Sequence, residues 1–279
     1  MSPAFSRVVR DGLTKVGLAG PAFRVYGAML AAHPGAVMSN ARYRRQGAPD
    51  GLPIPPSSLI YLVSGTTDIR WFLEGGALGA SSIRSALRDQ DVIVEQLNSI
   101  LDFGCGCGRV LRQWHGLPRT RVCGTDNNPR LVAWCRENLP FATVGLNHLA
   151  PPLEYGDGTF DLIYAMSVFT HLTEDLQVAW MKELRRVLRP DGHLVVSLHG
   201  DAYVDRLSES ERQRFSRGAL VVKNNTNAPG SNTCAAYHPY EYVHDELAGE
   251  LEIASFIPQG AKGNPPQDLY VLRNRALTP

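Results

Sequence analysis

Three glycines alternate with two cysteines directly after a short apolar run, in the stretch ILDFGCGCGRVL at residues 100–111. Glycine has no side chain, so a turn built from Gly104, Gly106 and Gly108 lets a ligand approach the backbone closely. In a doubly wound sheet, the turn after the first strand lies where the ligand binds. We therefore expect this glycine turn to form one wall of a ligand site, with the carboxylate of Asp102 directly in front of it.

The spacing of the glycines argues against a pyrophosphate ligand. The dinucleotide fingerprint is G-x-G-x-x-G, and it holds the pyrophosphate at the start of a helix. Here the glycines occupy every second position. Asp102 would repel a pyrophosphate, whereas it would attract an ammonium group. The turn thus favours a nucleoside that carries positive charge, and a nucleotide-dependent oxidoreductase is the alternative that this spacing disfavours.

The cysteines and the overall charge exclude several other classes of protein. Cys105 and Cys107 are predicted to be small fillers of the turn, the alternative being thiol ligands or redox groups. Five scattered cysteines without zinc-finger spacing predict no disulfide framework, no metal site and a cytoplasmic location. A net charge of +1 gives no field that would draw the chain to nucleic acid, so we expect no nucleic-acid partner.

Three histidines are candidate general bases. His171 follows SVFT, His199 ends the apolar run HLVVSL, and His238 lies in TCAAYHPYEY. An imidazole titrates near neutral pH and can take a proton from a hydroxyl group. We rank them in that order as catalytic candidates, and a structural or solvent-exposed histidine is the alternative for each.

Strand-like and helix-like segments alternate from Ser99 to Gly200, which predicts a parallel sheet with helices on both faces. The carboxyl ends of such strands share one edge of the sheet, where the glycine turn and the residues after later strands are expected to meet. Asp161 stands at the start of a strand in TFDLIY, so we expect it to be structural.

Residues 1–90 are predicted to form an N-terminal helical extension, and residues 91–279 the main domain. Ala41–Ser58 is rich in Pro, Gly and Arg, as is typical of an extended connector, and the segments after it predict short helices that end at glycines. The apolar N-terminus is interrupted by Arg24, His33 and Pro34, so we expect an amphipathic helix there, with no signal peptide and no stable membrane insertion.

The stretch LDFGCGCGRVL resembles the first motif of class I S-adenosylmethionine-dependent methyltransferases, D/E-x-G-x-G-x-G. The segments VCGTDNNPRLVAW, FATVGLNHLAPPLEYGDGTFDLIY, LRRVLRPDGHLVVSLHG and QDLYVLRN follow in the order that this family uses. The resemblance implies an α/β fold with a doubly wound, mostly parallel seven-stranded sheet and a closing antiparallel strand. It also implies S-adenosylmethionine as the cofactor. The segment at about residues 215–242 is expected to be a β-hairpin insertion after strand five.

By this resemblance, the cofactor-binding residues are Asp102, Gly104, Cys105, Gly106, Gly108, Asp126, Asn127, Asn147 and His148. Asp126 would accept hydrogen bonds from both ribose hydroxyls, and Asn127 would pack beside the adenine. The family commonly has an aspartate after strand three. This chain has Asn147, whose amide oxygen can accept the same hydrogen bond from the adenine amino group.

The resemblance implies methyl transfer to a small-molecule acceptor, of a natural-product or glycan type, with a hydroxyl group preferred over an amine or a carbon. Tyr61, Trp71 and Phe72 of the N-terminal extension, together with the insertion, are expected to contact the acceptor. No NPPY-type signature of a nucleic-acid amino-methylating enzyme precedes the fourth strand. The alternative is a protein of the same fold that binds S-adenosylmethionine without transferring its methyl group, such as a cyclase or a scaffold.

Overall fold

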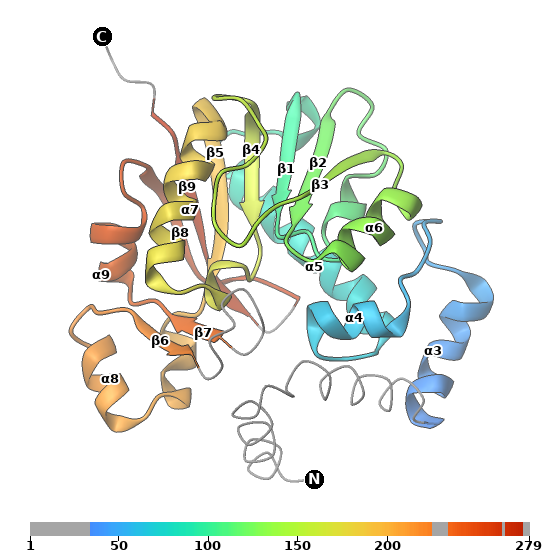
Figure 1. Ribbon diagram of the computed structural model, residues 1–279, viewed down its shortest axis with the longest axis horizontal. Helices are drawn as coiled ribbons and strands as arrows, with labels where there is room; N and C mark the ends of the chain where they lie inside the picture. Colours follow the sequence, from blue (N-terminus) through green and yellow to red (C-terminus); the bar gives the residue numbers. More distant parts are fainter. Residues whose placement is uncertain (1–33, 225–233, 264–265, 276–279) are drawn as a thin grey trace.

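A seven-stranded sheet forms the centre of the computed structural model, which describes residues 34–224, 234–263 and 266–275 (Figure 1). The strand order is β3-β2-β1-β4-β5-β9-β8; β1 to β5 are parallel, and β9 is antiparallel to both of its neighbours. The strands are β1 (Ser99–Phe103), β2 (Arg121–Asp126), β3 (Ala142–Leu146), β4 (Phe160–Ala165), β5 (Leu188–Leu198), β8 (Glu252–Ala261) and β9 (Gln267–Arg273). This order confirms the predicted doubly wound sheet and its closing antiparallel strand.

The register of the strands brings their carboxyl ends together along one edge, which we call the carboxyl edge. Asp102 of β1 pairs with Gly124 of β2 and with Tyr164 of β4, and Asp126 pairs with Leu146 at the end of β3. β1 and β4 are buried along their whole length, as expected for parallel strands with helices on both faces. Residues that directly follow β1 to β5 therefore meet at the carboxyl edge.

Helices cover both faces of the sheet. They are α3 (Pro34–Gln46), α4 (Ser57–Ser64), α5 (Ile69–Arg88), α6 (Pro129–Asn138), α7 (Glu174–Val187), α8 (Glu209–Phe215) and α9 (Tyr240–Tyr242), with the short 3-10 helices η1 (Val94–Gln96), η2 (Leu111–Trp114), η3 (Phe169–His171) and η4 (Asp201–Arg206) and the π-helix η5 (Val243–Leu247).

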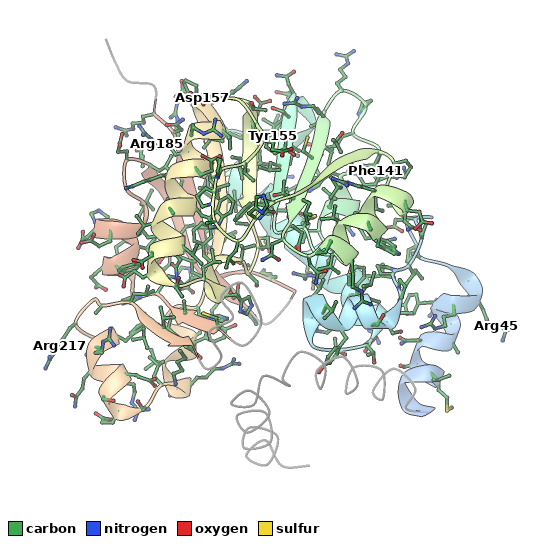
Figure 2. The ribbon with its side chains drawn as sticks, in the orientation of Figure 1. Arg45, Phe141, Tyr155, Asp157, Arg185 and Arg217 are labelled. Carbon is green, nitrogen blue, oxygen red and sulfur yellow. The ribbon has the colours of Figure 1, made fainter. Side chains whose placement is uncertain are left out.

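Successive strand residues enter two different apolar cores, because side chains alternate between the faces of a sheet. Ile100 packs in the core that contains α5 and α6, and Leu101 packs in the core that contains α7. Figure 2 shows how densely side chains fill the space around the sheet; the labelled Tyr155 meets the ring of Phe160 edge-on, with 4.8 Å between their centroids. The carboxyl edge is thus supported by a packed core on each side.

α4 is a short helix that ends at Ser64 and is capped by Gly65 in the left-handed conformation, so the predicted glycine stop is confirmed there. α5 is a single helix of 20 residues, so the prediction of two short helices separated by a glycine stop is wrong for this segment. Gly75 and Gly76 lie inside it. A Cβ atom at Gly76 would lie 2.1 Å from the carbonyl oxygen of Arg109, and one at Gly75 would lie 2.5 Å from that of Gly263. Only glycine permits this close contact with neighbouring backbone, and the packing outweighs the low helix propensity of glycine.

The predicted connector is also shorter than expected, because α3 continues to Gln46. Asn40 of α3 is buried; its side chain donates to the carbonyl of Thr67 (2.7 Å) and accepts from the amide of Ile69 (2.9 Å). These contacts fix α3 against the start of α5 and stabilise a helix that the local composition does not favour. Only residues 47–56 of the connector lie outside helices.

The insertion after β5 contains β6 (Val221–Asn224) and β7 (Cys234–Tyr237), which pair antiparallel as predicted. The tip at residues 225–233 and the helix predicted before residue 34 lie outside the described residues. α4 and α5 pack against the same core as the sheet, and the division into two parts near residue 90 stays a prediction. None of the described helices has the length and apolarity that crossing a membrane requires.

Candidate functional site

The glycine turn after β1 requires glycine for both conformation and space. Gly104, Gly106 and Gly108 all have positive φ angles, of 78°, 57° and 80°. A Cβ atom at Gly104 would lie 2.4 Å from a methyl group of Val168, and one at Gly106 would lie 2.8 Å from a methyl group of Val63. The turn is therefore enclosed between α4, which carries Val63, and the segment after β4, which carries Val168.

Asp126 ends β2 beside this turn. Its carboxylate accepts hydrogen bonds from the amide of Gly106 (2.9 Å) and from the amide of Asn128 (2.8 Å). Burial raises the pKa of Asp126, and these two amide donors oppose that effect. Each amide uses one lone pair of a different oxygen, so the carboxylate keeps a second lone pair on each oxygen with which it can accept from a ligand.

Asn147 follows β3 and lies next to Asp126, because its amide donates to the carbonyl of Asp126 (3.1 Å). Its side-chain nitrogen donates to the carbonyl of His148 (2.7 Å). Its side-chain oxygen is buried and has no partner among the described residues. This arrangement leaves one oriented acceptor at the carboxyl edge. The side chains of the other predicted residues here, Asn127 and His148, are exposed.

Asp102 lies beneath the turn rather than open to a ligand. It is 3% exposed, and it accepts hydrogen bonds from the hydroxyl of Tyr164 and the amide of Leu111. Tyr164 is in turn held by Trp114, whose indole nitrogen donates to its hydroxyl (2.7 Å). Burial raises the pKa of Asp102 to about 7, although the nearby charge of Arg109 opposes this rise. The attraction of Asp102 for the ammonium group of a ligand stays a prediction. Because Asp102 lies beneath the turn, this attraction would act through the turn over a short distance.

The cysteines of the turn are protonated thiols that fill space. Contact with Cys135 and burial raise the pKa of Cys105, and burial raises that of Cys107. The thiol of Cys135 donates to the carbonyl of Gly106 (3.4 Å). Within the described ranges, no group of three or more His, Cys, Asp and Glu side chains is arranged to hold a metal ion.

The three predicted histidines come together around β7. The ring nitrogen Nδ1 of His171 bonds to the carbonyl of Cys234 (2.8 Å), and that of His199 bonds to the carbonyl of Ala236 (3.1 Å). Because a carbonyl oxygen only accepts, Nδ1 carries the hydrogen in both rings and Nε2 carries the lone pair. The backbone amide of His238 donates to the carbonyl of His199 (2.8 Å). This bond also joins the end of β5 to the hairpin.

These histidines differ in how much of the ring a ligand can reach. His238 is 1% exposed, its Nε2 bonds to the side-chain oxygen of Gln177 (2.9 Å), and burial lowers its pKa to about 3. Burial lowers the pKa of His199 to about 4, and its ring packs on Tyr203 with 4.2 Å between centroids. His171 is only partly buried, and burial lowers its pKa as well. All three rings are therefore neutral near pH 7.

Two more predicted residue roles can be compared with the structure. Asp161 accepts hydrogen bonds from the amides of Asn98 and Ser99 and pairs with Arg189, so its structural role is confirmed. Among the residues expected to contact an acceptor, Tyr61 and Phe72 are buried, whereas Trp71 is partly exposed.

Sequence reasoning missed a hydroxyl network after β4. Ser167 has a positive φ angle of 61°, which is strained for a residue with a side chain. Its amide donates to the hydroxyl of Ser197 (2.8 Å), and both hydroxyls donate to the side-chain oxygen of Gln267 (2.9 and 2.7 Å). This network fixes the segment that carries Val168 against the glycine turn. The only signal in the sequence was a serine directly after an apolar strand.

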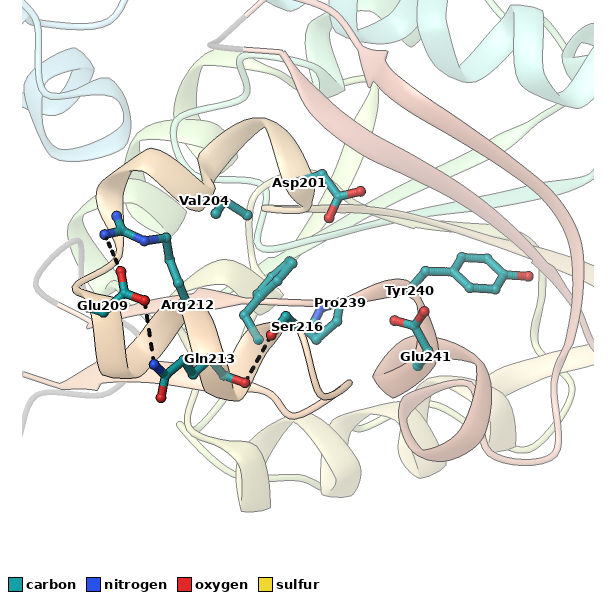
Figure 3. Close-up of a pocket in the computed structure, with 10 residues that line it drawn as sticks. Asp201, Val204, Glu209, Arg212, Gln213, Ser216, Pro239, Tyr240 and Glu241 are labelled. Atoms are coloured by element: carbon teal, nitrogen blue, oxygen red, sulfur yellow. Dashed lines mark hydrogen bonds and ion pairs between the residues drawn. The ribbon is translucent and has the colours of Figure 1, made fainter.

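A cavity of about 530 Å³ lies in the insertion, away from the predicted cofactor residues (Figure 3). η4, α8 and the start of α9 supply its walls. Arg212 pairs with Glu209 across one side (2.9 Å), and Figure 3 shows Asp201 and Glu241 on the side of Tyr240. Asp201 and Glu241 have no ion-pair partner within the described part of the chain, and the residues that line the cavity do not include any of the glycine turn.

Known proteins resemble this chain over its central part. Residues 100–192 match the family model described as a methyltransferase domain. The 2-methyl-6-phytyl-1,4-hydroquinone methyltransferase of a Synechocystis species is 31% identical over 105 residues, which cover 36% of this chain and 31% of that protein. The matched part spans between about a fifth and a half of the length of the curated relatives.

Solved structures show the same fold. A S-adenosylmethionine-dependent methyltransferase of Methanosarcina mazei superimposes with a TM-score of 0.51 at 18% identity and covers 68% of this chain and 98% of its own. The 1,6-didemethyltoxoflavin-N1-methyltransferase of Burkholderia thailandensis, solved with S-adenosylhomocysteine, gives 0.50 at 16% identity and covers 74% and 81%.

Proposed function

We propose that this chain, a member of the class I S-adenosylmethionine-dependent methyltransferase superfamily, transfers a methyl group to a hydroxyl group of a small molecule. Its cofactor is S-adenosylmethionine. The observation that supports the proposal most strongly is the unfilled hydrogen-bonding capacity at the ends of β2 and β3. A buried acceptor without a partner costs free energy, which a ligand donor would recover.

The described residues suit each part of this cofactor. Asp126 can accept from the two ribose hydroxyls, one at each carboxylate oxygen. The free side-chain oxygen of Asn147 can accept from the adenine amino group, and the bond from its nitrogen to His148 fixes that orientation. The glycine turn gives access to backbone groups. When bound, the cofactor supplies an electrophilic methyl group on a sulfonium ion.

On the acceptor side, His171 is the base that we propose. It lies three residues after Val168, which contacts the glycine turn, and its neutral ring has a lone pair on Nε2. A base in this state can take the proton of a hydroxyl group as the oxygen attacks. The bond from Nδ1 to Cys234 holds the ring in the required tautomer. His199 is the second candidate. His238 has no access to an acceptor, and we assign it to fixing the hairpin.

A small organic acceptor is supported by the chemistry around the site and by one relative. Trp71 offers a partly exposed aromatic face near the turn, and the Synechocystis relative is named for a hydroquinone acceptor. The alternative remains a protein that binds S-adenosylmethionine without transferring its methyl group. That alternative and the proposal differ in whether S-adenosylhomocysteine is formed.

The test is incubation of the purified chain with S-adenosylmethionine and a panel of phenols, hydroquinones and polyhydroxylated glycans, followed by mass spectrometry. We expect S-adenosylhomocysteine and a methylated hydroxyl compound in equal amounts. Cofactor binding without S-adenosylhomocysteine from any acceptor would contradict methyl transfer and favour the alternative. Methylation of amines alone would contradict the hydroxyl assignment.

A further inference from the structure

Gln267, the first residue of β9, has a side-chain amide that is bonded at one end only. The residue is 4% exposed, and its side-chain oxygen Oε1 accepts hydrogen bonds from the hydroxyls of Ser167 (2.9 Å) and Ser197 (2.7 Å). Its side-chain nitrogen Nε2 has no hydrogen-bond partner among the described residues, and it is not fully enclosed by protein. A ligand can therefore reach Nε2.

The hydrogen bonds of Ser197 determine which end of the amide faces the two serines. Ser197 is completely buried, and its hydroxyl already accepts from the amide of Ser167 (2.8 Å), so the hydroxyl hydrogen needs an acceptor. Oε1 of Gln267 is that acceptor. With the amide turned over, Nε2 would face Ser197, and the hydroxyl hydrogen would be buried without a partner. Nε2 is therefore a donor that points away from both serines.

The segment after β4 connects this donor to the proposed chemistry. Ser167 directly precedes Val168, which packs against the glycine turn at Gly104, and His171 follows in the same segment. Ser167 has a strained φ angle of 61°, and such strain is concentrated at functional sites. One short segment thus carries a contact with the glycine turn, the proposed base and a hydrogen bond to Gln267.

Aromatic rings lie next to the start of β9. The hydroxyl of Tyr203 donates to the carbonyl of Pro266 (3.1 Å), the residue before Gln267. The ring of His199 packs on that of Tyr203 at 4.2 Å and lies 5.5 Å from that of Tyr237. Ligand sites commonly combine such aromatic walls with a small number of directed polar groups. A flat, aromatic acceptor suits these surroundings, and Nε2 is a directed polar group beside them.

Gln267 has a different task from His171, because an amide N–H donor cannot take up a proton. The reacting hydroxyl gives its proton to the base, and its oxygen bonds to the methyl carbon as the carbon–sulfur bond breaks. A strong donor on that same oxygen would hold back the lone pair that attacks. The donor serves better at an oxygen that stays unchanged, so its partner is a second oxygen of the acceptor, in a carbonyl, ether or hydroxyl group.

We propose that Gln267 binds a second oxygen atom of the acceptor through Nε2 and thereby selects oxygen-bearing phenols over their hydrocarbon analogues. This inference rests on the proposed function, because it takes a hydroxyl compound as the methyl acceptor. It gives the network of Ser167 and Ser197 a task beyond fixing the segment after β4, since the two hydroxyls hold the amide in the orientation that binds.

The test compares methoxyphenols with ethylphenols in their 2-, 3- and 4-substituted forms, because each pair differs only by an oxygen in place of a methylene group. The full chain is incubated with S-adenosylmethionine and each phenol, and the rate of S-adenosylhomocysteine formation is measured. For at least one pair, we expect KM to be about three- to tenfold lower for the methoxyphenol, as for one hydrogen bond. The value of kcat should be similar within the pair.

Two variants remove the donor in different ways. Gln267→Glu retains an acceptor for both serines and replaces Nε2 with an oxygen, so the preference for the methoxyphenol should disappear. Gln267→Met has no polar hydrogen at any pH, and it should also give equal KM values within the pair. It keeps the proposal testable should the glutamate variant fail to fold.

Gln177 supplies a matched control. It is also buried, but both ends of its amide are bonded within the protein: Nε2 donates to the carbonyl of Leu172 (3.0 Å), and Oε1 bonds to His238 (2.9 Å). Gln177→Glu should therefore keep the wild-type preference.

The possible results separate this inference from the proposed function. Equal wild-type KM values in all three pairs, or an unchanged preference in folded Gln267→Glu or Gln267→Met, would overturn the inference and leave methyl transfer intact. No turnover of these phenols by a protein that methylates another hydroxyl compound would also overturn the inference alone. Failure to form S-adenosylhomocysteine with any acceptor would overturn the proposed function and the inference together.

Discussion

The carboxyl edge has two halves that are built in opposite ways. In the glycine half, at the ends of β1 to β3, polar groups keep unused capacity: the side-chain oxygen of Asn147 and Nη1 of Arg109 have no partners among the described residues. In the histidine half, after β4 and β5, His171 and His199 are each bonded to a carbonyl of β7. The first half keeps free hydrogen-bonding groups, as the proposed cofactor site requires. The second half holds the insertion in place, and His171 and His199 each keep one ring nitrogen that does not take part in these bonds.

Replacing His171 tests whether the histidine half also takes part in chemistry, and we expect the largest effect there. With an acceptor from the panel, His171→Ala should lower kcat by roughly 10²–10⁴-fold with little change in cofactor affinity, because a positioned base contributes that much. Since burial lowers the pKa of His171, the wild-type kcat should rise with pH and level off below the ordinary histidine value of about 6.5.

Trp71→Ala is the matched control for the base, because it removes an apolar wall and no proton acceptor. It should raise KM for the acceptor and leave the pH profile in place. An unaltered kcat in His171→Ala would remove His171 from the chemistry, and the same measurement on His199→Ala would then decide whether either ring acts.

Asp102→Asn tests whether the buried carboxylate of the glycine half lowers the stability of the fold near neutral pH. The folded-state pKa of about 7 lies above the unfolded value of about 3.9, so the contribution of Asp102 to stability is complete below the unfolded value, declines as pH rises from about 4, and is fully lost once pH passes about 7. The uncharged variant should escape this decline and gain up to about 4 kcal/mol on the wild type between pH 4 and pH 8. Urea unfolding at both pH values measures the difference. If the unfolding free energies of the two proteins changed with pH in the same way, ionisation of Asp102 would not destabilise the fold.

His238→Gln tests the structural role of the histidine half. The folded-state pKa of about 3 is depressed, so the stabilising contribution of His238 is complete above the unfolded value of about 6.5 and is lost as pH falls below it. Removing it should flatten the decline of the unfolding free energy by about 1.4 kcal/mol per pH unit between pH 6 and pH 4. The surface replacement His244→Gln should keep the wild-type slope. A variant slope equal to wild type would mean that His238 ionises freely in the fold.

Asn147→Ala should give the smallest effect, a severalfold loss of affinity for S-adenosylhomocysteine, because one neutral hydrogen bond contributes about 0.5–1.5 kcal/mol. Asn147→Asp keeps an acceptor and should bind nearly as well as wild type. Calorimetry on the two variants separates loss of the acceptor from loss of packing. Equal binding by Asn147→Ala and wild type would show that the free oxygen serves no ligand.

The sequence predicted the glycine half better than the histidine half, for a physical reason. The turn at residues 104–108 and the position of Asp126 depend on local spacing and strand order, which a motif records. The meeting of His171, His199 and His238 depends on carbonyl groups of β7, and no local pattern encodes such long-range contacts.

The same reason explains what sequence reasoning missed elsewhere. Local sequence predicts helix stops at the two glycines inside α5, and this prediction fails because their contacts are with Arg109 and Gly263, far away in the chain. The hydroxyl network of Ser167, Ser197 and Gln267 likewise joins three distant segments. Composition and periodicity describe each segment alone, so they predicted the sheet but neither of these contacts.

The most direct test of the account is a calorimetric titration of S-adenosylhomocysteine into the wild-type chain and into Asp126→Ala, with NADH as the competing nucleotide. The account predicts micromolar-range binding to wild type, about −8 kcal/mol. It predicts at least about tenfold weaker binding to the folded variant, since a carboxylate that accepts ribose hydroxyls contributes about 1.5–3 kcal/mol, and no binding of NADH. Equal affinity in the variant, or binding of NADH in place of S-adenosylhomocysteine, would contradict it.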